Sequence, residues 1–344
     1  MKRISVCVPT YNRPETLRQL INSFLKQDYK NKELVISDDS TNNLVEKTVK
    51  SFNNESIKYY KNNPSLRFAT NLITSIKRAS GDYIVILGDD DVFFKNNVLT
   101  KYVKVFNKYP SVGFIYGNLV QFSNKLEIEY IITNFSKDTL YRKKEDAMEN
   151  IWTRSIFIGG IGLRNTKDLP DMYPNKNILH PQVELVGNII NKSDAFGLAD
   201  YSIGIRSHDD QIIFHALKNK KIREDGEHVN VELFKIFKKL KHSYRLSLGT
   251  AFLERQLLNQ YYVMIFKEKS VLGNSFMDEN YQKFKQLSPV ANTSKKLYVL
   301  YVFASVLPRW SIRHLRNTAL HIVRFRNMKA FNKYKYNLRD MIKH

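Results

Sequence analysis

The feature that most constrains the fold is an alternation of short apolar runs and amphipathic segments over residues 1–91. The apolar runs are rich in β-branched residues and predict buried strands, while the segments between them repeat their apolar residues at helical spacing. Such alternation is typical of a parallel α/β sheet. Strands are expected at Ile4–Pro9, Glu33–Ser37, Ile57–Tyr60 and Tyr83–Leu87, and helices at 14–25, 44–52 and 67–79.

Polar residues follow three of these strands. They are Thr10-Tyr11-Asn12, Asp38-Asp39 and Asp89-Asp90-Asp91. Right-handed crossovers would bring the carboxyl ends of parallel strands to one edge of the sheet, where open α/β proteins bind ligands. The three segments are therefore expected to lie together at a binding site.

The rest of the chain has a different pattern. Residues 110–210 are mixed, with a strand expected at Val112–Tyr116, and from about residue 230 the chain reads as helices rich in Leu, Phe, Tyr and Lys. We expect a Rossmann-like α/β domain over 1–230, with a mainly parallel sheet flanked by helices, and a helical, basic region over 231–344.

The positive charge is concentrated near the end of the sequence. The chain has 55 Lys and Arg against 33 Asp and Glu, a net charge of +22, and residues 295–344 alone carry 12 basic side chains and 1 acidic one. The apolar run 297–307 precedes the densest arginines. Because a nucleic-acid binder would spread its charge over a binding face, this pattern favours a helix at an anionic membrane surface. The alternative is that the apolar side of this region packs on the preceding domain and its arginines are solvated.

The single cysteine, Cys7, lies in an apolar run, so an intrachain disulfide and a cysteine metal cluster are excluded. The first residues lack the apolar core and cleavage site of a signal peptide, and no run of apolar residues is long enough to span a bilayer. A cytoplasmic protein attached peripherally to the inner face of the cell membrane is expected.

The acidic run Asp89-Asp90-Asp91 predicts a metal site. Adjacent carboxylates at the end of a buried strand repel one another, and a Mg²⁺ or Mn²⁺ ion removes that cost and can bridge to phosphate oxygens. A solvated turn with a helix N-cap is the alternative, since aspartate favours both. The matching pair Asp38-Asp39 at a neighbouring strand end favours the metal site.

Three motifs resemble those of the family 2 glycosyltransferases, nucleotide-sugar enzymes with a GT-A fold. They are Ser5-Val-Cys-Val-Pro-Thr-Tyr-Asn-Arg13, Glu33-Leu-Val-Ile-Ser-Asp-Asp-Ser40 and Gly81-Asp-Tyr-Ile-Val-Ile-Leu-Gly-Asp-Asp-Asp91. Their order and spacing make the resemblance far more specific than any one motif. It covers residues 3–120 well and 120–215 loosely.

The resemblance assigns roles to individual residues. Thr10 and Tyr11 would lie against the base and ribose, and Asp39 would accept a hydrogen bond from the base. The metal would be held by Asp89 with Asp91, or chiefly by Asp90. The full set assigned to the nucleotide-sugar is Pro9, Thr10, Tyr11, Asp38, Asp39, Arg67, Asp89, Asp90 and Arg206; the set assigned to the metal is Asp89, Asp90, Asp91 and His208.

His208 could instead neutralise the diphosphate together with Arg206, and a helix N-cap by Ser207 or Asp209 is a further interpretation of that stretch. The alternative for Arg67 is a solvated helix residue, and the alternative for Tyr11 is packing in the core.

The catalytic base does not follow the family pattern. Where inverting members place an acidic pair before a helix, this chain has Pro181-Gln182, and a glutamine cannot accept a proton at neutral pH. His180 and Glu184 are the nearest groups that could act as general base. Alternatively, His180 caps the helix and Glu184 faces solvent.

The resemblance implies an inverting sugar transfer from a nucleotide-diphospho-sugar, with a UDP-sugar favoured, to a glycan or lipid-linked acceptor in bacterial surface polysaccharide assembly. A nucleotidyltransferase is an alternative, but Val8-Pro-Thr-Tyr-Asn-Arg13 lacks the glycines of a phosphate loop. A non-catalytic membrane- or nucleic-acid-binding module is a second alternative, which Gln182 supports.

Overall fold

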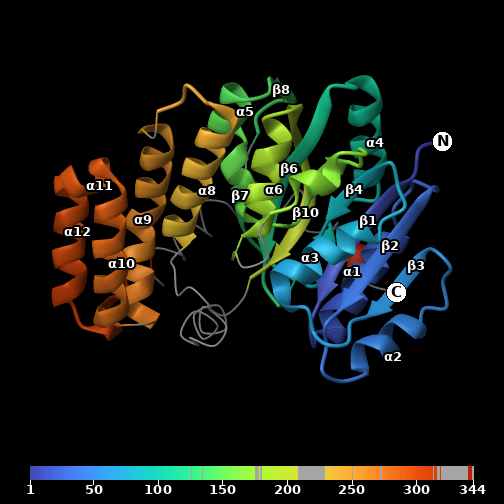
Figure 1. The fold of residues 1–344 in the computed structure, drawn as a ribbon. Coiled ribbons are helices and arrows are strands. Elements are labelled where there is room, and N and C mark those ends of the chain that lie inside the picture. The colour runs from blue at the N-terminus through green and yellow to red at the C-terminus, as the bar shows by residue number, and fades with distance from the viewer. Residues whose placement is uncertain are drawn as a thin grey trace. The chain divides into compact units, whose positions relative to one another are not determined.

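The structure is a computed structural model of the chain, and it describes residues 1–124, 126–133, 135–174, 178, 180–207, 229–249, 251–271, 273–312, 314, 315, 318 and 340–342. Contacts divide the chain into two compact units (Figure 1). The first comprises residues 1–207 and 330–344, and the second comprises residues 208–329.

The first unit is built on a 10-stranded mixed sheet in the order β3-β2-β1-β4-β9-β6-β10-β5, with β7 paired to β6 and β8 paired to β10. The strands are β1 (Ile4–Thr10), β2 (Lys32–Asp38), β3 (Ile57–Lys61), β4 (Tyr83–Ile86), β5 (Val92–Phe93), β6 (Val112–Phe122), β7 (Ile128–Thr133), β8 (Thr139–Tyr141), β9 (Ile161–Arg164) and β10 (Asp194–Arg206). The expected mainly parallel α/β sheet is confirmed.

Four neighbouring strands, β3, β2, β1 and β4, are parallel to one another. Their register pairs Thr10 with Asp38 and Cys7 with Ile86, so the carboxyl ends of these strands share one edge. Beyond β4 the sheet becomes mixed, because β9 runs antiparallel to both β4 and β6. The near-continuous burial of β1, β2 and β4 fits strands covered on both faces.

Helices connect and cover these strands. They are α1 (Pro14–Leu25), α2 (Leu44–Lys50), α3 (Arg67–Lys77), α4 (Val98–Lys108), α5 (Glu145–Asn150) and α6 (Pro181–Ile190), with 3-10 turns at Trp152–Ile156 and Leu169–Met172. Pro14 and Pro181 each occupy a first helical turn, where the missing N–H costs nothing. α1 buries the apolar stripe that the sequence predicts, including Leu17, Ile21 and Phe24.

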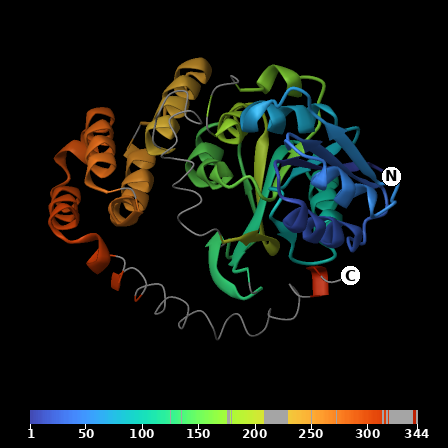
Figure 2. The same ribbon diagram turned by 90° about the horizontal axis from the view of Figure 1, so that it is seen from below.

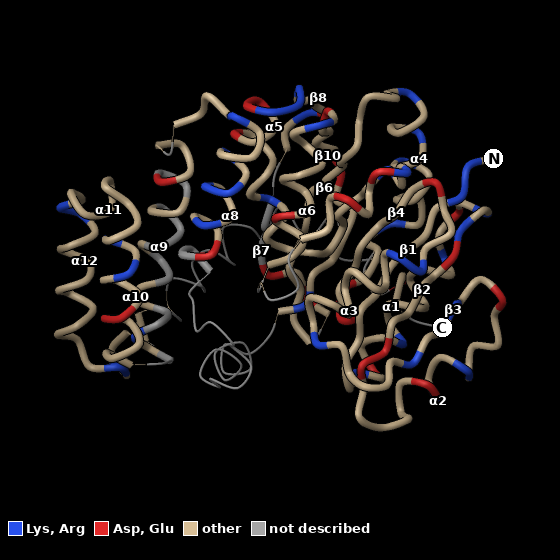
Figure 3. The backbone as a smooth tube through the Cα atoms, viewed as in Figure 1, with Lys and Arg blue, Asp and Glu red and all other residues tan. Residues whose placement is uncertain are grey.

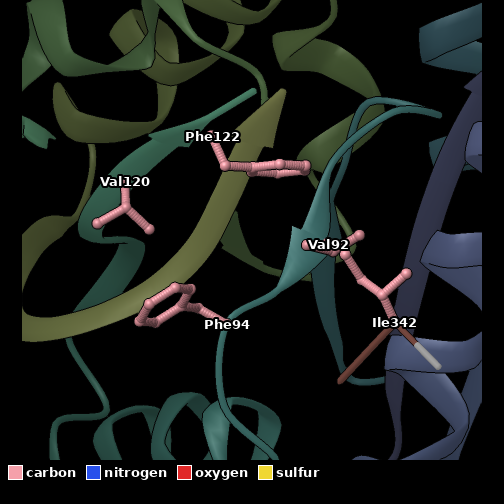
Figure 4. Packing of buried hydrophobic residues seen from close by; sticks show 5 residues of the cluster. All are labelled: Val92, Phe94, Val120, Phe122 and Ile342. Atoms are coloured by element: carbon pink, nitrogen blue, oxygen red, sulfur yellow. The ribbon is translucent and has the colours of Figure 1, made fainter. Parts of the chain in front are cut away.

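The end of the chain returns to this unit. Met341 and Ile342 are both 6% exposed, and Ile342 packs in a cluster with Val92, Phe94, Val120 and Phe122 (Figure 4). The Asn22 side-chain amide of α1 donates to the Ile342 carbonyl at 3.0 Å, and the Lys26 ammonium donates to the Asp340 carbonyl. Figure 2 shows this turn, in red, beside the first helices. No sequence pattern indicates this return.

The described part of the second unit is helical, as the sequence predicts. Its helices are α8 (Val229–Tyr244), α9 (Ala251–Val271), α10 (Asn274–Leu287), α11 (Pro289–Thr293) and α12 (Lys295–Val306). Aromatic contacts join them, such as the stacked rings of Tyr281 and Tyr301, whose centroids are 3.9 Å apart. Among the described residues, no helix has the length and apolar character needed to cross a bilayer.

Candidate functional site

The site lies where β1 and β4 end. Asp89 is 6% exposed, and its Oδ2 accepts hydrogen bonds from the Thr10 hydroxyl at 2.9 Å and from the Tyr11 backbone N–H at 3.2 Å. The acidic run is therefore bonded directly to the first motif, as the shared strand edge predicts. The Tyr11 side chain is 53% exposed, which argues against core packing. Pro9 precedes them inside β1, paired in register with Ser37.

Arg13 binds two carboxylates of the acidic run. Its Nη1 lies 3.0 Å from Asp89 Oδ1 and 2.8 Å from Asp90 Oδ2. Arg13 is the last residue of the first motif, and the sequence alone assigns it no role. Such a bridge lowers the repulsion between two adjacent carboxylates and holds the Asp89–Asp90 turn against the start of α1.

Asp91 is the most enclosed of the three carboxyl groups. It is 4% exposed and accepts a hydrogen bond from the Gly88 N–H at 3.0 Å. Gly159 packs so closely that a Cβ there would lie 2.5 Å from Asp91 Oδ2. Burial, and then the charge of Asp90, raise the pKa of Asp91 well above its usual range.

The same causes act on Asp89. Burial and the Asp90 charge raise its pKa to about 6, against the opposing charge of Arg13. Burial and mutual repulsion therefore disfavour the ionised form of these carboxyl groups. A bound cation would relieve this repulsion.

Arg206, at the end of β10, is a second cation beside the acidic run. It is 7% exposed and lies over the Phe122 ring, with its guanidinium carbon 4.7 Å from the ring centroid. It donates to Gln19 Oε1 and, at 3.2 Å, to Asn124 Oδ1. Burial lowers its pKa, and the charges of Asp90 and Asp91 raise it, which places the guanidinium within their field. His208 lies outside the described residues.

The pair Asp38-Asp39 lies at the end of the neighbouring strand β2. Asp38 is buried and accepts from the Tyr59 hydroxyl at 2.7 Å and from the Lys61 ammonium at 3.2 Å. These contacts tie the ends of β2 and β3 together.

Asp39 holds the loop that leads into α3. Its Oδ1 accepts from the Asn62 amide at 2.7 Å, and its Oδ2 accepts from the Ser65 hydroxyl and the Leu66 N–H, both at 3.0 Å. In the described part of the chain these three bonds use three of the about four acceptor positions that a carboxylate offers. Arg67 follows this loop with an exposed side chain and a φ of 61°, a left-handed conformation that non-glycine residues seldom adopt.

The residues considered for the catalytic base lie at the start of α6. His180 precedes the helix and makes no side-chain capping bond, so the capping interpretation is not supported. Glu184 is 3% exposed and does not face solvent. The Gln182 amide donates to the Ile156 carbonyl at 2.9 Å, while its buried Oε1 has no hydrogen-bond partner in the described part of the chain.

One short segment connects α6 with the acidic run. Ile156 bonds to Gln182, the Tyr116 hydroxyl donates to the Phe157 carbonyl at 3.0 Å, and Gly159 packs against Asp91. Residues 156–159 therefore span from the start of α6 to Asp91.

Comparison with known proteins assigns a family to part of the chain. The model of glycosyl transferase family 2 matches residues 5–169. This segment is a family 2 glycosyltransferase domain. It contains all three motifs on which the resemblance rested, together with Arg13.

Curated relatives match the same part of the chain. The GalNAc(5)-diNAcBac-PP-undecaprenol β-1,3-glucosyltransferase of Campylobacter jejuni is 30% identical over 156 residues, which cover 43% of this chain and 48% of that protein. The Escherichia coli enzyme WfgD, a UDP-Glc:α-D-GlcNAc-diphosphoundecaprenol β-1,3-glucosyltransferase, is 31% identical over 115 residues, or 33% of this chain and 45% of that protein. The match thus spans less than half the length of either relative.

The glycosyltransferase fold also matches a solved structure. Staphylococcus aureus TarS 1–349, in complex with UDP-GlcNAc, superposes with a TM-score of 0.57 at 16% identity, covering 88% of this chain and 90% of TarS 1–349. At this identity the similarity establishes the fold alone. The expected GT-A-like architecture with a helical C-terminal region is confirmed.

Proposed function

We propose that the chain transfers a sugar from a nucleotide-diphospho-sugar to an acceptor hydroxyl, with inversion at the anomeric carbon. The observation that carries the proposal is the cluster at the β1 and β4 ends, where Thr10, Tyr11 and Arg13 all contact the acidic run. The exposed Tyr11 ring would lie against the base and ribose. The remaining acceptor position of Asp39 would take a base N–H.

The acidic run supports a divalent cation by its chemistry. Carboxylate oxygens are the ligands that Mg²⁺ and Mn²⁺ prefer, and burial together with the Asp90 charge raises the pKa of Asp89 and Asp91, which a bound cation would oppose. The described residues contain no group of three or more such side chains placed to hold a metal. That is compatible with Mg²⁺, which is usually bound by one or two carboxylates together with substrate phosphates.

The ligands would be Asp89 with Asp91, or chiefly Asp90. When bound, the ion would neutralise the diphosphate and the departing nucleoside diphosphate. Arg206, whose charge interacts with Asp90 and Asp91, would add to the positive charge available to the diphosphate.

The acceptor hydroxyl must lose a proton during transfer, and His180 or Glu184 would accept it. His180 directly precedes α6 and Glu184 lies in its first turn, and residues 156–159 connect this end of the helix to Asp91. The buried amide of Gln182 cannot take this role.

A lipid-linked acceptor fits the names of both relatives, which specify undecaprenol diphosphate substrates, and a UDP-sugar donor fits the name of the Escherichia coli relative. We extend both to this chain as part of the proposal. Together with the 12 basic residues of 295–344, they favour peripheral attachment at the inner face of the cell membrane during polysaccharide assembly.

Donor hydrolysis by the full chain tests the proposal. A panel of UDP- and GDP-sugars should reveal one donor from which nucleoside diphosphate is released in Mg²⁺ or Mn²⁺ and not in EDTA. Conversion of the donor, when diphosphate is added, to a nucleoside triphosphate and a sugar 1-phosphate would instead indicate a nucleotidyltransferase. Donor binding without hydrolysis or transfer would indicate a non-catalytic binding module, the alternative that Gln182 supports.

A further inference from the structure

Helix α12 is apolar on two opposite faces, and its own unit covers only one of them. Leu297 and Ala304 are fully buried, and Tyr301 stacks on Tyr281 and donates to Asp278 at 2.9 Å. These residues recur at intervals of three and four and define the covered face.

The opposite face is exposed. Tyr298, Val299, Val302 and Val306 are 59%, 62%, 38% and 77% exposed, and their spacing places them on one side of the helix. We call these four residues and Trp310, which is 73% exposed just beyond the helix, the α12 apolar face. A helix that is apolar all round is normally buried in a core or in a membrane.

The surroundings of this face are basic. Lys295 and Lys296 are exposed at the start of α12, Arg309 is exposed after its end, and α12 itself contains no acidic residue (Figure 3). Asp278 meets α12 through Tyr301, on the covered side. An apolar face flanked by cations matches an anionic bilayer surface, where the rings and methyl groups enter the interface and the cations remain among the headgroups.

The positive charge around the α12 apolar face also distinguishes between possible binding partners. A second copy of this chain would bring the same lysines and arginines to the interface, and like charges would then oppose association. An anionic leaflet is attracted by them.

We propose that the α12 apolar face is the surface by which the protein binds anionic membranes. The inference rests on the proposed function in one respect: a lipid-linked acceptor gives the enzyme a reason to be at the bilayer. It deepens that proposal by assigning attachment to named residues of α12.

Vesicle co-sedimentation of the full chain tests the assignment. The vesicles are phosphatidylcholine alone, or phosphatidylcholine with phosphatidylglycerol. The test variant carries Val299→Gln, Val302→Gln and Val306→Gln, which remove apolar area without changing charge or introducing a poor helix former. Leu44→Gln is the matched control, because Leu44 is 51% exposed in the first unit.

The wild type and the control should bind the anionic vesicles, and binding should weaken in high salt. The triple variant should bind at least about tenfold more weakly, since about 0.8 kcal/mol is lost per CH₂ withdrawn from the bilayer. Unchanged binding by the triple variant, or equal binding to neutral vesicles, would overturn the assignment. So would a triple variant that lost self-association in solution while keeping its vesicle binding.

Donor hydrolysis separates the two proposals. A triple variant that hydrolyses donor normally and fails to bind vesicles supports the membrane face. A wild type that binds vesicles through this face and hydrolyses no donor would remove the proposed function and leave the membrane face standing.

Discussion

Asp91 is a buried carboxyl group whose ionisation opposes folding in the absence of metal. Burial and the Asp90 charge raise its folded-state pKa, whereas in the unfolded chain the value is about 3.9. The cost of ionising Asp91 is therefore absent below the unfolded pKa and grows as the pH rises toward the folded pKa. Asp91→Asn should raise the unfolding temperature of the metal-free protein at pH 7.5, measured by calorimetry, and abolish the further rise that Mn²⁺ produces.

The matched control is Glu55→Gln, because Glu55 is exposed and far along the chain from the acidic run. Glu55→Gln should leave unchanged both the unfolding temperature of the metal-free protein and the rise that Mn²⁺ produces. A metal-free Asp91→Asn protein that is less stable than the wild type would mean that the Gly88 hydrogen bond outweighs the desolvation of the charge. Undiminished Mn²⁺ stabilisation would remove Asp91 from the proposed ligands.

At the scale of elements, the two candidates for the general base lie at the start of α6. His180→Ala or Glu184→Gln should lower kcat by roughly a hundredfold or more with little change in donor KM, which is the expected loss of a general base. The variant that removes the base should also remove the acidic limb of the rate against pH. Gln182→Ala is the comparison, since it changes the same helix turn without removing a proton acceptor.

Near-normal rates in both variants would place the proton acceptor outside α6. A fall in rate accompanied by an equal rise in donor KM would instead indicate that α6 shapes the donor site. A Glu184→Asp variant with a higher kcat than Glu184→Gln would favour a carboxylate base over a packing role for Glu184.

The strands and helices of the first motifs were predictable because their signals are local. The β-branched runs and helical spacings of residues 4–86 identify β1, β2 and β4 to within a residue or so at each end. The meeting of Thr10 and Tyr11 with Asp89 also followed from the sequence, since parallel strands align their carboxyl ends.

The features that escaped prediction depend on side-chain reach or on distant pairing. Arg13 belongs to a quoted motif, but nothing in its spacing shows that its guanidinium bridges two carboxylates some seventy-six residues away. The antiparallel insertion of β9 between β4 and β6, and the packing of Gly159 on Asp91, are likewise set by tertiary contacts. The hydrophobic periodicity of a segment indicates which of its faces is buried, but it does not indicate which other segment covers that face.

On the scale of the whole molecule, the return of residues 340–342 joins the end of the sequence to the first unit. Ile342 packs against Val92, which directly follows Asp91, and its carbonyl accepts the Asn22 amide (Figure 4). Buried isoleucine truncated to alanine typically costs about 2–5 kcal/mol, and a site near a chain end should give a value at the lower limit because it can collapse. Ile342→Ala should therefore loosen α1 and β5, seen as faster amide hydrogen exchange in both.

Hydrogen exchange is the appropriate measurement because a chain of two units need not unfold in one step, whereas exchange reports each element separately. Asp340→Ala is the control, since its exposed side chain is removed while the backbone carbonyl that accepts from Lys26 is kept. If Ile342→Ala left amide exchange in α1 and β5 as slow as in the wild type, residues 340–342 would contact the first unit without stabilising these two elements. If exchange rose there and donor hydrolysis fell, the last residues would help to hold the acidic run in place through Val92.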